Sequence, residues 1–298
     1  MNPRIKLAVQ KSGRLNEKSL RILRRAGITF DGNSGNLILS SPDFPIDLML
    51  LRSCDIPKYV NNGICDLGIV GDNVLQEELA SNRAMTLQTR KKLGFGNCRL
   101  SLAVPVDEPF SGISDFQNRK IATSYPRTLE KYLETQGIRC EIIEISGSVE
   151  IAPALGIADA ICDLVSTGST LKSNNLREIK TISESEAVLI QSNIFREPEI
   201  LAEKAAIISR LLERIDGVMR AERTKYIMMN APANKIDEIK SLIPGMEAPT
   251  IIPLGGSRSD QVAIQAVAKE DVFWDTMQAL KQIGASSILV VPIEKIII

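Results

Sequence analysis

The residues best suited to chemistry lie between Asp163 and Leu171, where an acidic residue is followed by small hydroxyl residues around a glycine. The apolar run before Asp163 predicts a strand that delivers this segment to the edge of a sheet. Backbone N–H groups in such a turn form a concave anion site, which the N-terminus of a following helix strengthens. The residues expected to bind a phosphate group are Ser166, Thr167, Gly168, Ser169 and Thr170. An ordinary strand-to-helix turn with a Ser or Thr cap is the alternative.

Two acidic residues near this loop are candidates for binding ribose hydroxyls. Asp163 directly precedes the loop and can act as a bidentate acceptor. Glu150 could share this role, or it could be a first-turn residue that the helix dipole favours. A second polar segment, Gln10–Arg14, follows an apolar run, and the charges of Lys11 and Arg14 suit a triphosphate or pyrophosphate. Such basic residues are also common on a solvated surface.

The composition excludes several classes of mechanism. None of the 298 residues is histidine, so Ser-His-Asp and Cys-His nucleophile systems and imidazole metal ligands are impossible. Any metal must be a hard cation bound by oxygens, which points to Mg²⁺. Lys plus Arg and Asp plus Glu number 36 each, and the zero net charge argues against binding to nucleic acid or an anionic membrane. The five cysteines contain no Cys-x-x-Cys pair, which argues against a zinc site. Since neither a leader segment nor a membrane span is visible, we expect a cytoplasmic protein.

An internal duplication is expected to position the two polar segments. The tetrapeptide Ile64–Leu67 recurs as Ile161–Leu164, and each copy has a glycine four residues beyond its leucine. Upstream of each copy we expect a strand and a helix, namely strands at Ile5–Val9 and Ile121–Ser124 and helices at Leu15–Ala26 and from Pro126 to Gly137. Strands alternating with helices predict two α/β lobes with parallel strands. Each lobe should contribute one half-site to a shared cleft at the carboxyl ends of its strands.

The remaining chain connects the lobes and adds a third module. Asn97–Pro105 is the expected crossing to the second lobe, and the strand Ala187–Gln191 with the helix around Ile200–Ala221 is the expected return. From Tyr226 onward the predicted order is β-α-β-β-α-β, the ferredoxin-like plan. The residues alone leave regulation and plain dimerisation equally open for this module.

Several motifs together resemble the ATP phosphoribosyltransferase family, the first enzyme of histidine biosynthesis. The main one is Glu150-x5-Gly156-x-Ala158-x2-Ile161-x-Asp163-Leu164-x2-Thr167-Gly168-x-Thr170-Leu171. Further segments similar to this family are Gln10–Leu15, Asp66–Gly71, Cys98–Ala103 and Gly284–Val290. The resemblance runs nearly end to end and includes the C-terminal module, which marks the long form of the enzyme.

The resemblance implies a fold and an activity. The implied fold is a two-lobed catalytic core similar to periplasmic binding proteins plus a ferredoxin-like regulatory domain that binds histidine. The lobe on the ATP side would comprise residues 1–96 and 182–224, the phosphoribosyl pyrophosphate lobe residues 97–181, and the regulatory domain residues 225–298. The implied pentosyltransferase joins ATP to 5-phosphoribosyl 1-pyrophosphate with Mg²⁺, releasing pyrophosphate and N1-(5-phosphoribosyl)-ATP. Homodimers and homohexamers are typical of the family.

The resemblance also assigns roles by position. Ser166 to Thr170 would hold the 5′-phosphate of phosphoribosyl pyrophosphate, and Asp163 with Glu150 its ribose hydroxyls. The residues lining the ATP and pyrophosphate side would be Gln10, Lys11, Gly13, Arg14, Asp72 and Arg99. Effector histidine would lie near Asn230, Thr250, Ala285 and Ser286. Mg²⁺ would be carried mainly by the substrate phosphates, with no protein ligands assigned.

The expected chemistry needs no general base, because adenine N1 is already an unprotonated lone pair at neutral pH. The difficult event is the departure of pyrophosphate while positive charge builds on the ribose, which cations and a nearby carboxylate can stabilise. Two other functions are consistent with a two-lobed fold: a small-molecule binding protein and a catalytically inactive regulatory paralogue. The intact loop, together with Lys11 and Arg14, argues against the inactive paralogue.

Overall fold

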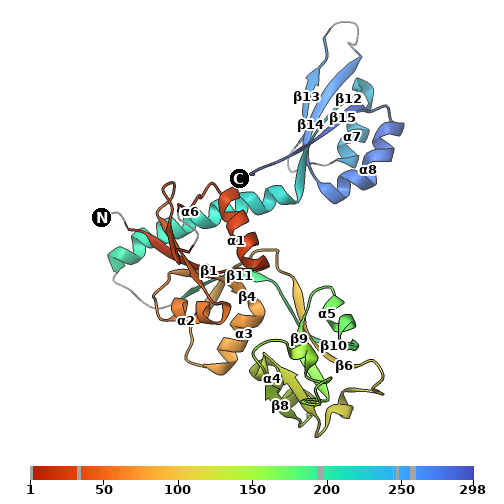
Figure 1. Cartoon of the computed structure of the whole chain (residues 1–298). Coiled ribbons are helices and arrows are strands. Elements are labelled where there is room, and N and C mark those ends of the chain that lie inside the picture. The colour runs from red at the N-terminus through yellow and green to blue at the C-terminus, as the bar shows by residue number, and fades with distance from the viewer. Residues whose placement is uncertain (1–2, 32–34, 193–197, 244, 246–247, 256–259) are drawn as a thin grey trace. The chain divides into compact units, whose positions relative to one another are not determined.

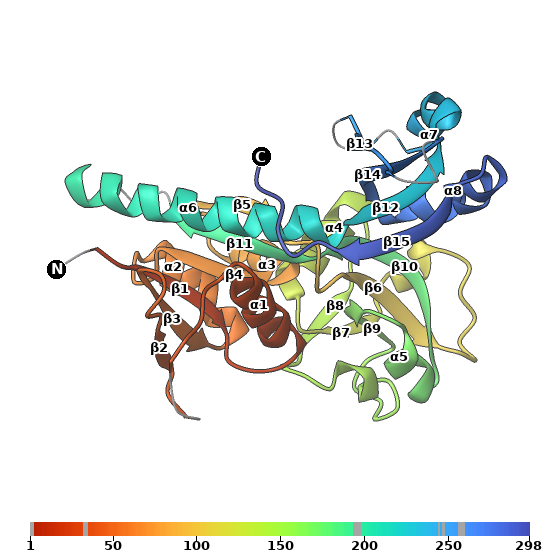
Figure 2. The ribbon, with the colours of Figure 1, turned by 90° about the horizontal axis from the view of Figure 1, so that it is seen from above.

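The computed structural model describes residues 3–31, 35–192, 198–243, 245, 248–255 and 260–298. It contains two compact units, one formed by Met1–Arg21 with Thr29–Ile207 and the other by Ile22–Ile28 with Ile208–Ile298. The division falls inside the long helix α6 (Pro198–Glu222), which Figure 2 shows along its length. The boundary predicted from the sequence lies at residues 224 and 225, near the end of this helix.

The first unit holds two β-sheets, seen in Figure 1 as one lobe around β1 and β4 and another around β6 and β9. The first sheet has the order β2-β3-β1-β4-β11-β5. Its strands are β2 (Ile38–Ser40), β3 (Ile46–Leu51), β1 (Ile5–Gln10), β4 (Leu67–Gly71), β11 (Ala187–Ser192) and β5 (Leu87–Lys92). Its helices are α1 (Arg14–Arg25), α2 (Ile56–Asn61) and α3 (Asp72–Ser81), with a 3₁₀ turn at Ser53–Asp55. The central strands are buried on both faces, as their continuous apolar runs require.

The second sheet has the order β10-β6-β9-β7-β8. Its strands are β10 (Leu176–Ser185), β6 (Cys98–Pro105), β9 (Ala160–Val165), β7 (Lys120–Thr123) and β8 (Glu141–Glu144). Helices α4 (Pro126–Gln136) and α5 (Ser169–Ser173) and 3₁₀ turns at Ile113–Phe116 and Val149–Ile151 connect them. Gly137 ends α4 in a left-handed conformation with φ +69°, which is the conformation that glycine commonly adopts at the end of a helix.

The duplication predicted from the sequence is present in the topology. Strands β3-β1-β4-β11-β5 of the first lobe match β8-β7-β9-β6-β10 of the second in order and in direction. The two lobes exchange one antiparallel strand each. Strand β6 comes directly after β5 in the chain but lies in the second sheet, and β11 comes directly after β10 but lies in the first sheet. Both expected crossings are therefore confirmed.

The repeated tetrapeptide does not occupy equivalent places in the two lobes, and this expectation is wrong. Asp66 precedes β4, where its N–H donates to the Lys6 carbonyl (2.9 Å) and its carboxylate accepts the Lys6 N–H (2.8 Å). In the second lobe Asp159, not Asp163, exchanges the same two hydrogen bonds, with Lys120, at 2.9 and 2.8 Å. The true repeat is therefore displaced by four residues from the sequence identity. Pairing with the neighbouring strand sets the register, and Ile, Cys and Leu suit any buried strand position.

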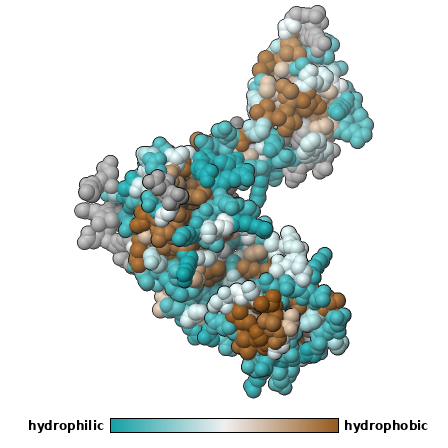
Figure 3. Space-filling model, viewed as in Figure 1, coloured by the Kyte–Doolittle hydropathy of each residue, from teal (hydrophilic) through white to brown (hydrophobic). Residues whose placement is uncertain are grey.

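The second unit contains the C-terminal module, with β12 (Thr224–Pro232), α7 (Ile236–Leu242), β13 (Thr250–Pro253), β14 (Gln261–Lys269), α8 (Glu270–Gln282) and β15 (Ser286–Pro292). The β-α-β-β-α-β order is confirmed, and the sheet order is β13-β14-β12-β15. Ile227, Met229 and Ile264 are buried with Ile239 and Leu280 of the two helices. Some strand residues remain exposed, among them Leu289 at 57%, and Figure 3 shows apolar surface on this module. Across the described part of the chain, no helix combines the length and hydropathy that a membrane span requires.

Candidate active site

The predicted phosphate loop leaves β9 as an exposed turn. Gly168 has φ +77°, a left-handed conformation that glycine adopts at no steric cost, and it precedes α5. The side chains of Thr167 and Ser169 are exposed, with their hydroxyl oxygens 3.0 Å apart. Leu171 is buried and anchors the loop to the core of its lobe. The turn thus presents backbone and hydroxyl groups outward from a fixed base, as an anion site requires.

Arg99 lies beside this loop, on strand β6. Its Nη1 donates to the carbonyl oxygen of Ser166 at 3.2 Å, while Nε and Nη2 donate to the two carboxylate oxygens of Glu178. Ser101 and Thr181 donate hydroxyl hydrogen bonds to the same carboxylate, at 2.8 and 3.3 Å. The hydrogen bond from Arg99 is the main cause that lowers the pKa of Glu178. Arg99 therefore groups with the loop of the second lobe, although it was predicted on the ATP and pyrophosphate side.

Glu178 is a residue that sequence reasoning missed. It lies 79 positions from Arg99, and in the register of β6 and β10 it is opposite Ala103 rather than Arg99. Nothing local in the sequence marks it, because the contact depends on the pairing of β6 with β10, which places Glu178 on the same face of the sheet as Ser101 and Arg99.

The two carboxylates predicted to bind ribose, Asp163 and Glu150, interact electrostatically. Burial raises the pKa of Asp163, the Leu164 N–H that donates to its carboxylate opposes this, and the negative charge of Glu150 raises it further. Burial also raises the pKa of the Tyr125 hydroxyl, and the charge of Asp163 adds to that effect. The charges of Glu150 and Asp163 thus act on each other, and the charge of Asp163 acts on a half-buried tyrosine, close to the start of the predicted phosphate loop.

The first lobe presents its predicted residues at the carboxyl ends of β1 and β4. Gln10 ends β1, Gly13 turns the chain with φ +88°, and Arg14 begins α1. Asp72 begins α3 directly after β4, and its carboxylate accepts a hydrogen bond from Gln76 (3.2 Å). Since β1 and β4 are adjacent and parallel, these residues share one edge of the sheet, where ligands bind in such folds. Lys11, in the same turn, is exposed.

The four residues predicted to contact histidine divide into two places in the C-terminal sheet. Asn230 of β12 is paired with Ser286 of β15, and Ala285 precedes Ser286. Thr250 lies on β13, at the opposite edge of the four-stranded sheet, where it is paired with Gln265. Three of the four residues are therefore together within one chain, and Thr250 is separated from them by strand β14.

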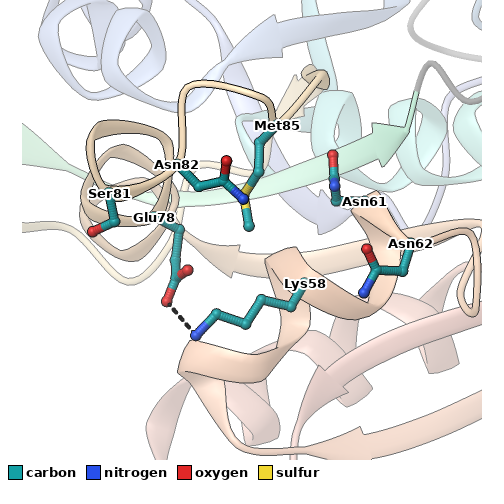
Figure 4. Close-up of a pocket in the computed structure, with 7 residues that line it drawn as sticks. All are labelled: Lys58, Asn61, Asn62, Glu78, Ser81, Asn82 and Met85. Atoms are coloured by element: carbon teal, nitrogen blue, oxygen red, sulfur yellow. Dashed lines mark ion pairs between the residues drawn. The ribbon is translucent and has the colours of Figure 1, made fainter.

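A cavity of about 360 Å³ in the first lobe contains none of the predicted site residues. It is lined by Lys58, Asn61, Asn62, Glu78, Ser81, Asn82 and Met85, which come from α2, from α3 and from the segments directly after these helices (Figure 4). Lys58 Nζ lies 3.1 Å from a carboxylate oxygen of Glu78, so these two charged lining residues neutralise each other. Within the described residues, no cluster of three acidic or cysteine side chains is suited to hold a metal ion.

The comparisons with known proteins agree on one family. The family model for ATP phosphoribosyltransferase (HisG) matches residues 52–217, and the model for the HisG C-terminal domain matches residues 221–295. The ATP phosphoribosyl transferase (HisG:HisZ) complex from Thermotoga maritima contains a chain that is 30% identical, with a TM-score of 0.59 over 71% of this chain and 98% of that one. The periplasmic aliphatic sulphonate binding protein SsuA from Escherichia coli matches at 15% identity and a TM-score of 0.48, covering 72% of each chain.

Proposed function

Because the chain belongs to the ATP phosphoribosyltransferase family, we propose that its two lobes divide the two substrates of that enzyme between them. The enzyme is a glycosyltransferase of histidine biosynthesis that condenses ATP with phosphoribosyl pyrophosphate. The observation that supports this assignment of substrates to lobes is the loop after β9. It combines exposed hydroxyl groups, a glycine in the left-handed conformation and the nearby carboxylates Asp163 and Glu150.

In this proposal the second lobe binds phosphoribosyl pyrophosphate. The segment Ser166–Thr170 accepts the 5′-phosphate through its backbone N–H groups and hydroxyls. Asp163 and Glu150 accept hydrogen bonds from the ribose hydroxyls, and such bonds to ionised carboxylates are the stronger kind. Arg99 stabilises the loop through the Ser166 carbonyl and adds positive charge near the phosphate.

The first lobe then binds ATP and the pyrophosphate. Its carboxyl-end segments supply Lys11 and Arg14 as cations, Gly13 as the turn, and Gln10 and Asp72 as polar neighbours. Adenine N1 attacks the ribose C1 atom as its bond to pyrophosphate breaks, so the attacking lone pair forms the new C–N bond and pyrophosphate leaves with the old bonding pair. No side chain accepts a proton in this step. The positive charge that develops on the ribose is stabilised by the carboxylate pair.

Mg²⁺ is proposed as the cofactor. The carboxylates Glu150 and Asp163 are hard oxygen donors that fit this ion, and the described residues lack a larger acidic cluster, so the substrate phosphates would carry most of it. When bound, Mg²⁺ would neutralise the charge of the departing pyrophosphate.

The C-terminal module is proposed to bind histidine and to regulate the transfer through a change among homo-oligomers, from dimer to hexamer. The adjacent Asn230, Ala285 and Ser286 form one part of the histidine site. Thr250, from the far edge of the sheet, would join them only if a neighbouring subunit completes the site.

One assay tests the activity and its regulation. The protein is mixed with ATP, phosphoribosyl pyrophosphate and Mg²⁺, and pyrophosphate release is followed with and without histidine. Turnover that requires both substrates and that histidine suppresses supports the proposal. Binding of both substrates without any turnover would instead indicate an inactive paralogue.

A further inference from the structure

Helix α4 of the second lobe is capped by a carboxylate from the first lobe. Glu77, on α3, accepts the backbone N–H of Arg127 at 2.8 Å through one oxygen. Its other oxygen accepts the backbone N–H of Thr128 at 2.9 Å and the Thr128 hydroxyl at 2.6 Å. Three hydrogen bonds to one ionised group therefore link residues 50 and 51 positions apart.

The cap comes from a distance because α4 has none of its own. The N-cap residue, Tyr125, makes no side-chain capping bond, and Pro126 occupies the first turn. The backbone N–H groups of Arg127 and Thr128 have no carbonyl partner within the helix, and they lie at the positive end of the helix dipole. A negative carboxylate at this position satisfies both requirements.

A second contact fastens the same two helices. Asn73, at the start of α3, donates from Nδ2 to the Tyr125 hydroxyl at 2.8 Å. Its backbone N–H donates to the Ser185 hydroxyl, and the Ser185 hydroxyl donates to the Asn73 Oδ1, each at 2.9 Å. Ser185 ends β10, just before the chain returns to the first lobe through β11. The contact between α3 and α4 thus lies next to the crossing segment.

We propose that Glu77 is a positioning residue for the transfer, holding the two substrate-bearing lobes at the separation that the reaction needs. This rests on the proposed function, in which phosphoribosyl pyrophosphate and ATP occupy opposite lobes. Each substrate is then oriented by its own lobe, and the α3–α4 contact sets the line between adenine N1 and ribose C1. A displacement of about 1 Å between reacting groups can reduce a rate about a hundredfold.

The consequence is a particular kinetic pattern. Loss of Glu77 should lower kcat while each KM changes little, because the binding groups on either lobe are untouched. A merely structural residue would instead reduce the amount of folded enzyme or raise both KM values.

The test compares Glu77→Gln with Glu78→Gln in the full-length protein. Glu78 is the adjacent residue on α3 and pairs with Lys58 inside the first lobe, so it is a matched control. In Glu77→Gln, the amides of Arg127 and Thr128 should exchange hydrogen about tenfold faster, while amides in the middle of α4 keep their protection. The same variant should lose about tenfold or more in kcat, with both KM values within about twofold of wild type. Glu78→Gln should match the wild type in all of these.

A second variant guards against a folding failure. Thr128→Val removes only the hydroxyl bond and should shift exchange and kcat in the same direction by a smaller factor. Unchanged exchange at Arg127 and Thr128 in Glu77→Gln overturns the proposal, and so does faster exchange with an unchanged kcat. If the wild type catalyses no transfer, the proposed function fails and the positioning role falls with it. The exchange data then still show whether Glu77 holds the lobes together.

Discussion

The partly buried carboxylate of Asp163 accepts the Leu164 N–H at 2.8 Å, and the negative charge of Glu150 acts on it unfavourably. Together with burial, this raises the pKa of Asp163 above its usual value. A raised carboxyl pKa means that the folded protein binds the proton more tightly than the unfolded chain does, so the ionised carboxylate at neutral pH lowers the free energy of unfolding. Ribose hydroxyls or a cation bound at these carboxylates would relieve this unfavourable interaction.

Replacing Asp163 with Asn should raise the thermal midpoint of the apo protein at pH 7. Since the folded pKa is raised, the wild type carries this cost in full only at pH values above it, and the gain should vanish as the pH falls toward the unfolded value of about 4. The variant should also bind phosphoribosyl pyrophosphate about tenfold more weakly. Calorimetric scans across pH and a binding titration measure the two effects.

Asp159→Asn is the matched control for that variant. Asp159 precedes the same strand, and its carboxylate accepts the Lys120 N–H, so this change should lower stability at pH 7. Equal thermal midpoints for Asp163→Asn and wild type at neutral pH would contradict the electrostatic account.

Replacing Thr167 and Thr170 with Val should raise the KM for phosphoribosyl pyrophosphate by about tenfold and the KM for ATP by less than about twofold. The reason is that both hydroxyls belong to the loop proposed to hold the 5′-phosphate. Steady-state kinetics with each substrate varied in turn gives both constants. Thr135→Val, on the exposed part of α4, should leave both unchanged. Equal increases in the two KM values would contradict the proposal that this loop holds the 5′-phosphate.

Replacing Glu178 with Gln should weaken phosphoribosyl pyrophosphate binding about threefold to tenfold, because Arg99 loses the partner that aims it at Ser166. The pKa of Glu178 is lowered in the folded state, so its contribution to stability is present above its usual value of 4.5 and is lost as the pH falls through the lowered value. Acid unfolding should therefore begin at higher pH in the variant.

Glu141→Gln, on strand β8 at the other edge of the same sheet, removes an exposed carboxylate that pairs with Lys120, and it serves as the control for both measurements. If it affects binding as much as Glu178→Gln does, the effect arises from the negative charge of the second lobe in general and not from the hydrogen bonds between Glu178 and Arg99.

Replacing Lys204 with Met should destabilise the first unit by about 3 kcal/mol. Lys204 Nζ lies 3.0 Å from both oxygens of Asp66, and the two side chains are only 16% and 7% exposed, so the variant leaves a buried carboxylate without its cation. Urea unfolding measures the free energy. Lys58→Met, which breaks the more exposed pair with Glu78, should cost less than about 1 kcal/mol. Similar losses for the two variants would show that burial of the Asp66 pair does not matter.

Much of the fold follows from local pattern. The strands and helices predicted in the two lobes, the ends of α1 and α4 and the β-α-β-β-α-β module agree with apolar periodicity and glycine placement. The exposed loop predicted to bind phosphate is also recognisable in the sequence, because its residues are contiguous and its conformation depends on one turn of backbone. The family assignment rests on the same contiguous motifs.

The sequence by itself therefore determined the strands and helices around the two repeated segments, the order of the C-terminal module, the loop at Ser166–Thr170 and the exclusion of imidazole chemistry. The tertiary structure decided which aspartate of the second lobe corresponds to Asp66, which carboxylate holds Arg99, and which residue caps α4. Each of these depends on strand register or on a hydrogen bond between residues tens of positions apart. Such contacts arise only when lobes and sheets pack, since the free energy that selects them comes from burial and from satisfying polar groups across the fold. A local sequence pattern does not identify those partners.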